Sequence, residues 1–426
     1  MLSASDNVAI IGAGLAGMAA ALALNELSIK SSVYEMRDTN VAPPRSSGAL
    51  MLSPNALKIL QRFGLYSKIE ALSYPFEFIH YKDEHEETIE RYPLGDEAAF
   101  GYKAMRIYRQ DLLDVLFAAC SERGISIHFN KKFAGVTNET DSQVTFKFTD
   151  GTSETASLLI GADGIHSKLR DYVTPNVEKK FIGFAALTWE AKTAQLRIPE
   201  DKDYKFPVTI LTANGAFVLA PQKNDGSLML AGTQIPLKEK DREGWSGYLA
   251  DKETLVERAG QNLDVWPDIV KSSMVDIDRE SINVWPFYRI PRLSDWTSPK
   301  HHRVVILGDA AHAIPPTTGQ GASQAFEDVR SLALLLSAQK QNAGLKWEET
   351  LQFWQKMRQD RIDDLLVLTQ QLNNKRLPLE QQKLLAKEEL WIDESATNPT
   401  QMAWLYNPDI EGTVNAWVEK VAPKAA

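Results

Sequence analysis

Three glycines near the start of the chain have the spacing of a phosphate-binding turn. Gly12, Gly14 and Gly17 follow an apolar, β-branched stretch and precede an Ala- and Leu-rich one, which is the order of a strand, a turn and a helix. In such a turn the first glycine permits the bend, the second admits a pyrophosphate, and the third allows close helix–strand packing. Glu35 ends the next strand-like stretch, where a carboxylate can bind an adenosine ribose. The pattern predicts a site for NAD or FAD.

Two further strand-like stretches each end in an acidic residue. One leads to Asp163 and Gly164, and the other leads to Gly308 and Asp309. Because an α/β fold binds its ligand at the carboxyl edge of the parallel sheet, both carboxylates can converge with the first turn on one extended molecule. A second acid at a strand end suits the ribityl hydroxyls of a flavin, and this favours FAD.

These three motifs, in this order, resemble those of the group A flavoprotein monooxygenases, the family of 4-hydroxybenzoate and salicylate hydroxylases. The resemblance spans roughly residues 7–330, whereas residues 370–426 match no motif of the family. It implies an enzyme that uses FAD, NAD(P)H and O₂ to hydroxylate an aromatic or related unsaturated small molecule through a flavin C4a-hydroperoxide. A flavin-dependent epoxidase, decarboxylative hydroxylase or other oxidoreductase of this fold, and a non-catalytic binding protein, are the alternatives. Ser323 departs from the family, in which asparagine is common at this position.

The resemblance also implies which residues contact the cofactor. Residues 45–55 resemble the family's mobile flavin loop, and residues 108–112 resemble its FAD-contacting arginine segment. Backbone amides of residues 319–321, with the dipole of the helix that follows, can stabilise negative charge on reduced flavin. NAD(P)H would visit a surface groove near Asp163 and Arg170. The predicted FAD-binding residues are Gly12, Gly14, Leu15, Ala16, Gly17, Glu35, Met36, Arg37, Arg45, Gly48, Arg109, Asp163, Gly164, Arg170, Gly308, Asp309, Gly319, Gln320, Gly321 and Ala322.

The substrate end of the site has fewer candidates. His80 alternates with aromatic residues in an extended run, so it is a candidate base that could line an aromatic pocket; a half-exposed strand histidine is the alternative. Trp189 and Phe217 are candidate pocket walls, with a plain core role as the alternative. Pro315 and Pro316 lack backbone donors and suit a stiff wall of the oxygen-transfer pocket, unless they only break the loop before a helix.

Composition excludes several classes of protein. The 426 residues carry 47 basic and 56 acidic side chains, a net charge of −9, which argues against binding nucleic acid by electrostatics. Cys120 is the only cysteine, so we expect no metal centre built on cysteines, and a reducing, cytoplasmic setting fits. No export signal or apolar run of roughly 20 residues is visible. We expect a monomer or homodimer acting on a small molecule, with no metal.

The motifs require an α/β scaffold with a second, sheet-rich part. Alternating and aromatic runs with hairpin signals occupy residues 74–100 and 181–285, and helical periodicity dominates after about residue 320. We predict a Rossmann-like, GR2-type FAD-binding domain with an inserted, mostly antiparallel substrate domain and a C-terminal helical extension. The predicted bounds are 1–73, 101–180 and 286–345 for the FAD-binding domain, 74–100 and 181–285 for the substrate domain, and 346–426 for the helical region.

Overall fold

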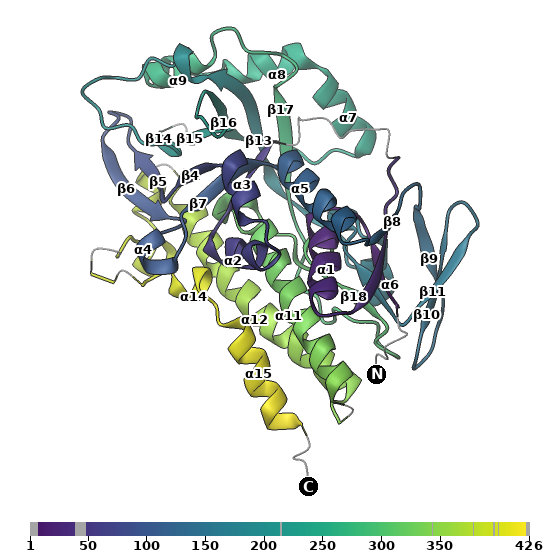
Figure 1. The fold of residues 1–426 in the computed structure, drawn as a ribbon. Helices are drawn as coiled ribbons and strands as arrows, with labels where there is room; N and C mark the ends of the chain where they lie inside the picture. Colours follow the sequence, from purple (N-terminus) through teal and green to yellow (C-terminus); the bar gives the residue numbers. More distant parts are fainter. Residues whose placement is uncertain are drawn as a thin grey trace.

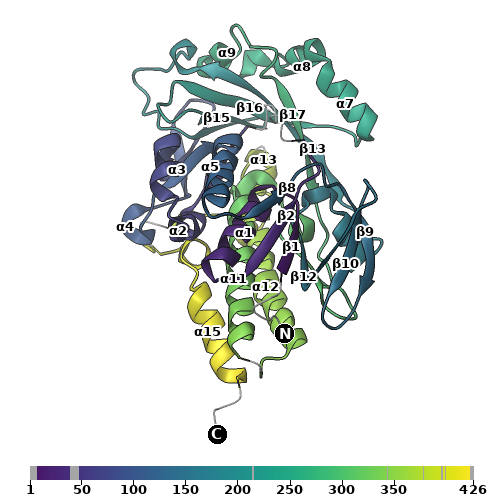
Figure 2. The same ribbon diagram turned by 45° about the vertical axis from the view of Figure 1, so that its right-hand side comes forward.

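The structure is a computed structural model, and Figures 1 and 2 show its ribbon from two sides. It describes residues 7–38, 48–213, 215–342, 344–377, 379–394, 397, 398 and 400–422. In both views a large sheet with short helices lies at the top, a smaller parallel sheet lies in the middle, and long helices extend below.

The middle layer is a parallel sheet that contains all three motif strands. From one edge to the other its strands are β18 (Val304–Ile306), β12 (Leu158–Gly161), β1 (Asn7–Ile11), β2 (Lys30–Tyr34) and β8 (Ser126–His128). Each neighbouring pair is parallel. The strands that precede the three motifs are therefore adjacent, and their carboxyl ends meet at one edge, as predicted.

Both faces of this sheet are covered. Helix α1 (Leu15–Glu26), whose residues 17–24 are all buried, packs between the sheet and helices α5 (Arg109–Glu122) and α11 (Gly321–Gln341). A helix that is apolar on all sides needs such complete enclosure. The opposite face is covered by a three-stranded sheet, in which Phe146 and Phe148 contact Tyr34 of β2. Its strands are β9 (Phe133–Glu139), β10 (Val144–Phe148) and β11 (Ser153–Ala156).

The top layer is a seven-stranded sheet. Its order is β17 (Asn283–Arg289), β13 (Lys180–Lys192), β16 (Leu228–Pro236), β15 (Gly215–Pro221), β14 (Val208–Thr212), β5 (Phe78–Lys82) and β6 (Thr88–Pro93). Among the described strands of this sheet, only β14 and β5 pair in parallel, so the expectation of a mostly antiparallel sheet is confirmed. Helices α7 (Arg242–Ala250), α8 (Lys252–Ala259) and α9 (Asp268–Ser273) lie on its outer side (Figure 1).

A small sheet connects the two large ones. Strand β7 (Ala104–Tyr108) lies between β3 (Ala49–Leu52) and β4 (Tyr74–Phe76), and both pairings are antiparallel. The short helices α2 (Pro54–Arg62), α3 (Tyr66–Leu72) and α4 (Glu97–Phe100) flank it. Residues 74–76, which fall in the predicted substrate segment, thus pair with β7 and not with the seven-stranded sheet.

Long helices support the motif edge from below. Helix α11 packs on α1, α2, α12 (Trp347–Asn374) and α15 (Ile410–Val421), and both views show α11, α12 and α15 side by side. Short helical turns, including α13 (Leu379–Gln382) and α14 (Ala403–Tyr406), join α12 to α15. The predicted helical character of the C-terminal region is confirmed. Within the described ranges, no helix has both the length and the apolar surface needed to cross a bilayer.

Candidate active site

A cavity of about 470 Å³, here called the inner cavity, lies between the motif edge of the parallel sheet and the seven-stranded sheet. All three motif segments reach it, so the predicted convergence is present in the structure. The predicted cofactor and proline residues that line it are Gly14, Leu15, Ala16, Arg109, Gly164, Asp309, Pro316, Gly319, Gly321 and Ala322. The seven-stranded sheet contributes Ile79, Ala186, Thr188, Thr209, Ala216, Val218, Leu230, Gly232, Thr233, Gln234 and Phe287, and Pro207 lines the cavity directly before β14.

The glycine turn has the geometry that a bound pyrophosphate requires. Gly12 has φ +103°, and a Cβ there would lie 2.5 Å from the carbonyl oxygen of Ala162; a Cβ at Gly17 would lie 1.9 Å from the carbonyl oxygen of Gly12. A Cβ at Gly14 would meet nothing within 4 Å, and Gly14 lines the inner cavity. Helix α1 begins directly after it without a side-chain cap, so its first amides remain available for an anion. The turn therefore fits the diphosphate of FAD.

Glu35 is fixed behind this turn. One carboxylate oxygen accepts a hydrogen bond from the Ala13 amide at 2.8 Å, and the other accepts from the amide and Nε of Arg37 at 3.0 and 2.9 Å. Burial acts to raise the pKa of Glu35, but these hydrogen bonds and the Arg37 charge outweigh it and lower the pKa. Glu35 is thus an ionised acceptor at the end of β2, while the Met36 side chain is mostly exposed.

Arg170, in the motif after β12, has a structural role that the sequence did not reveal. Arg170 is buried, and its guanidinium donates to the carbonyl oxygens of Ala310 at 3.1 Å and Ile165 at 2.8 Å. It therefore ties this motif to the one after β18. These contacts occupy the Arg170 guanidinium inside the protein, whereas a visit of NAD(P)H to a surface groove near Asp163 and Arg170 stays a prediction.

Asp163 also acts within the protein. One of its carboxylate oxygens accepts hydrogen bonds from the amides of Lys168 and Leu169, at the start of helix α6 (Lys168–Val173), and its Oδ1 is buried without a partner. Burial raises the pKa of Asp163. Because Gly164, and not the Asp163 side chain, lines the inner cavity, direct contact between Asp163 and FAD stays a prediction.

The motif after β18 is held by buried charges from two helices. The Gly308 amide donates to Oδ2 of Asp328 at 2.9 Å, and Nε2 of His312 lies 2.5 Å from the same oxygen. Nε of Arg358, on α12, donates to Oδ1 of Asp328 at 2.7 Å. Asp309 is left facing the inner cavity. Sequence reasoning missed Asp328 and Arg358, although charged residues within apolar helical runs are a signal for buried ion pairs.

A second buried network holds the loop before α11. Nε2 of Gln320 donates to the Ser53 hydroxyl at 2.8 Å, which lies 3.1 Å from the Ser323 hydroxyl. Nδ2 of Asn55 donates to Gln320 at 3.2 Å and to Glu327 at 2.6 Å. Gln320 is therefore a support for Gly319 and Gly321, which line the cavity, and Ser323 fits this network through its hydroxyl.

The structure corrects the expected role of His80. Strand alternation turns Ile79 into the inner cavity, so the neighbouring His80 lies on the other face of β5, where its ring is 6.4 Å from that of Phe78. Burial, followed by Lys205 and Arg91, lowers the pKa of His80. A histidine on that face cannot take a proton from a substrate in the cavity.

The expected aromatic walls are also corrected. Trp189 and Phe217 pack against each other at 5.6 Å between ring centroids, and Phe217 packs on Trp266. These rings belong to the core under α7–α9, while the alternate residues Thr188, Ala216 and Val218 face the inner cavity. Trp189 contributes only to a neighbouring pocket described below.

The other predicted residues are readily placed. Pro316 lines the inner cavity, whereas Pro315 precedes it outside the lining. Gly48 lies at the neighbouring pocket. Arg45 lies outside the described residues.

Two cavity arginines were missed by sequence reasoning. Arg106 is 5% exposed, and burial lowers its pKa to about 10. Arg376, just after α12, lines the same cavity. An arginine in the otherwise apolar stretch 104–108 was a usable signal, whereas nothing in the sequence connects Arg376 with the motifs.

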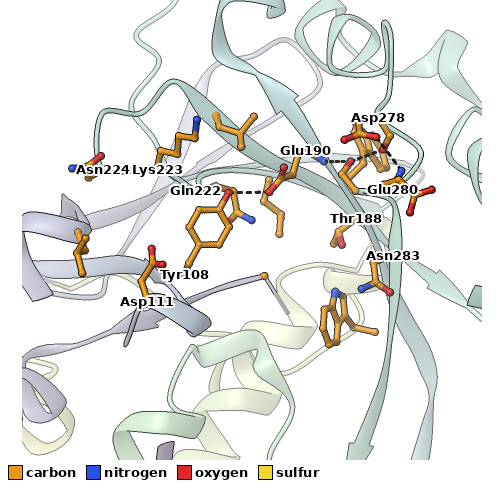
Figure 3. A pocket seen from close by; sticks show the side chains of 17 residues that line it. Tyr108, Asp111, Thr188, Glu190, Gln222, Lys223, Asn224, Asp278, Glu280 and Asn283 are labelled. Carbon is orange, nitrogen blue, oxygen red and sulfur yellow. Dashed lines mark hydrogen bonds between the residues drawn. The ribbon is translucent and has the colours of Figure 1, made fainter. Parts of the chain in front are cut away.

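A second pocket of about 510 Å³, here called the outer pocket, adjoins the inner cavity, with Thr188 and Leu230 in the lining of both. Figure 3 shows the Tyr108 hydroxyl directed at Glu190, to which it donates at 2.9 Å. The charged residues of its lining are Asp111, Glu190, Asp278, Glu280 and Lys223.

The dinucleotide turn and two further motifs lie at one edge of the parallel sheet, and the cavity beside them is also lined by the second sheet. Fold and site together therefore define a flavoprotein oxidoreductase. Comparison with known proteins makes the class specific. The FAD binding domain family matches residues 6–366, so the chain belongs to this family.

Named relatives agree on the type of reaction. The chain is 30% identical over 336 residues to 3-amino-4-hydroxybenzoate 2-monooxygenase PtnB3 of Streptomyces platensis, covering 78% of this chain and 79% of that protein. It is 28% identical over 432 residues to salicylate hydroxylase of Pseudomonas putida, covering 95% and 93%.

Solved structures share the fold over nearly the whole chain. A salicylate hydroxylase substrate complex has a TM-score of 0.75 at 21% identity and covers 99% of both chains. CtdE in complex with FAD and a substrate has a TM-score of 0.78 at 22% identity and covers 98% of both. The predicted family, fold and cofactor are confirmed: this is an FAD-dependent aromatic monooxygenase.

Proposed function

We propose that this enzyme uses NAD(P)H and O₂ to hydroxylate an aromatic small molecule in the part of the inner cavity covered by the seven-stranded sheet. The observation that carries the proposal is that all three FAD motifs and the inner face of this sheet line one cavity. When bound, FAD supplies the electron transfer and the oxygen activation.

The residues of the chain position the reactants and shield them from water. The α1 amides after Gly14 bind the diphosphate, while Glu35 and Asp309 accept hydrogen bonds from hydroxyls of the cofactor. The first amides of α11, at Gly321, stabilise negative charge at the flavin edge. Small and apolar side chains of the sheet, with Pro316 opposite, enclose a flat ring and exclude solvent.

The remaining predicted contacts belong to this proposal. Arg109 lines the cavity and is proposed, with Arg45, to meet the phosphates or ribose, and Gly48 is proposed to contact FAD as part of the same loop. Support for Gly48 is that it lines the outer pocket and that the next residue, Ala49, lines the inner cavity.

Purified protein tests the proposal directly. It should be yellow and should release FAD on denaturation. Phenols, hydroxybenzoates and indoles should be screened for accelerated NADH and NADPH oxidation, and mass spectrometry should find one oxygen atom from ¹⁸O₂ in the product. Complete recovery of the oxygen as peroxide would show a flavin oxidoreductase without oxygen transfer, and protein that cannot be loaded with FAD would refute the proposal. An epoxide or a loss of CO₂ would identify the related reactions.

We also propose a cytoplasmic enzyme that is a monomer or homodimer. The buried, free thiol of Cys120, whose pKa burial raises to about 12, is compatible with a reducing compartment. Fractionation of the native cells and light scattering of the holoenzyme test these two points.

A further inference from the structure

Arg106 is a buried cation without an acidic partner. Its side chain is 5% exposed, its Nη2 donates to Oε1 of Gln222 at 2.8 Å, and its Nε has no hydrogen-bond partner. Among the described residues, no carboxylate forms an ion pair with it. A buried charge normally has a charged partner because leaving water is costly. The missing partner therefore points to a ligand.

Arg106 lines the inner cavity, and its hydrogen-bond partner Gln222 lines the adjoining outer pocket. On β7, Arg106 is paired with Met51 of β3, and directly opposed residues share one face of a sheet. Met51 on that face lies beside Gly319, at 3.3 Å from the position of a Cβ there. Gln222 directly follows β15 of the seven-stranded sheet. Arg106 thus lies between the loop before α11 and the seven-stranded sheet, which covers the proposed substrate part of the cavity.

The charges of the inner cavity indicate which ligand fits. Its charged lining residues are Arg106, Arg109, Arg376 and Asp309. Arg109 and Asp309 are assigned to FAD in the proposed function, so the charges left for a second ligand are both positive. A neutral ring would leave Arg106 buried without a counter-ion, whereas an anionic ring would supply one.

We propose that Arg106 binds a carboxylate on the ring of the substrate, and that Gln222 is the positioning residue that holds the guanidinium in place. This inference rests on the proposed function. The planar guanidinium matches the two oxygens of a carboxylate, and its free Nε is one of the donors that such a pair needs. A phenolate carries the same charge on one oxygen and is the alternative source of the anion.

Ligand binding to the FAD-loaded enzyme tests the inference, with the flavin absorption band as the readout. The probes are benzoate, its neutral isostere benzamide, and 4-nitrophenolate. We expect wild-type enzyme to bind benzoate at least tenfold more tightly than benzamide. Arg106→Met should remove this preference while leaving benzamide affinity within about twofold, and Arg106→Lys should keep part of it.

Matched variants separate Arg106 from other cations. Lys223→Met removes a positive charge from the outer pocket and should leave the benzoate preference intact. Arg376→Met tests the second cavity arginine. If Arg376→Met loses the preference for benzoate over benzamide and Arg106→Met keeps it, the assignment of the carboxylate to Arg106 is overturned. A Gln222→Leu variant should weaken benzoate binding and leave FAD affinity unchanged.

The outcomes also separate this inference from the proposed function. Enzyme that takes up FAD but binds benzoate no better than benzamide, or binds neither, overturns the inference alone. A preference for 4-nitrophenolate over benzoate, lost in Arg106→Met, would replace the carboxylate with a phenolate. Loss of FAD affinity in Arg106→Met would show that Arg106 serves the cofactor. Failure of wild-type protein to bind FAD would instead refute the proposed function.

Discussion

The inner cavity and the outer pocket are neighbours with opposite charge. The inner cavity combines small and apolar sheet residues with the guanidinium groups of Arg106 and Arg376, whereas the outer pocket has four carboxylates and the ammonium of Lys223. Thr188 of β13 and Leu230 of β16 belong to both linings. The two environments are therefore adjacent, and we expect the charge of a small molecule to influence which of them it occupies.

The inner cavity and the outer pocket also differ in the hydrogen bonds that hold their lining residues in place. Inner-cavity residues are supported by buried networks around Asp328 and Gln320. Hydrogen bonds among the outer-pocket residues, such as those of Tyr108 with Glu190 and of Ser281 with Asp278, are only partly buried or exposed. We therefore expect substitutions on the inner side to have large effects and those on the outer side to have small ones.

The largest effect is expected from Gly14→Val. The branched side chain would project into the space that receives the diphosphate, since a Cβ there meets no protein atom. We expect purified variant to contain less than a tenth of the wild-type flavin, as measured by absorbance, with an unchanged circular dichroism spectrum. Full flavin occupancy would refute the placement of the cofactor. Gly135→Val, in β9 and outside the cavity, is the matched control, because a Cβ there also meets nothing within 4 Å.

The next effect concerns the buried ion pairs behind the cavity. Arg358→Met would leave Glu327 and Asp328 buried without this partner, and we expect a loss of about 3–5 kcal/mol in the free energy of unfolding. Lys356→Met, two residues away on the same helix, breaks only an exposed pair with Asp360 and should cost about 0.5 kcal/mol or less. Urea denaturation of both variants measures the difference, and equal losses would contradict the proposed contrast.

Asp309→Ala should weaken FAD binding and leave the fold intact. The carboxylate lines the inner cavity, and charge-assisted hydrogen bonds contribute about 1.5–3 kcal/mol each, so we expect at least a tenfold rise in the dissociation constant. Titration of apoprotein by flavin fluorescence measures it. An unchanged constant would mean that the carboxylate does not contact FAD.

The smallest effect is expected in the outer pocket. Glu190→Gln keeps a group that can accept from Tyr108 and removes one negative charge from the lining. FAD affinity and benzamide binding should change less than about twofold. A tenfold change in either would show that the outer pocket takes part in binding to the inner cavity, and the comparison of the two regions would need revision.

The sequence predicted the cofactor end well because its signals are local. Gly12–Gly17 lies between a strand and a helix, and parallel strands share their carboxyl edge, so Asp309 could be placed beside the turn. His80 failed because an alternating strand predicts which residues share a face and not which face points inward. Trp189 and Phe217 failed for the same reason.

The substrate end is assembled from distant and unrelated segments. Arg106 reaches it on β7, Arg376 follows α12, and the lining residues of the seven-stranded sheet come from six of its strands. Their proximity depends on the packing of three layers, which no spacing along the chain records. Arg170 illustrates the same limit, because its partner Ala310 is 140 residues away.

The ion pairs of Arg358 have a consequence for shortened forms of this enzyme. Glu327 and Asp328 belong to α11, which begins at the flavin loop, yet their buried counter-ion comes from α12. A chain cut after residue 345 would keep every recognisable motif. It would lose Arg358, the cation that neutralises Glu327 and Asp328. The α12 cations are therefore an electrostatic necessity for the cofactor site, and removing the 81 residues after residue 345 should abolish flavin retention.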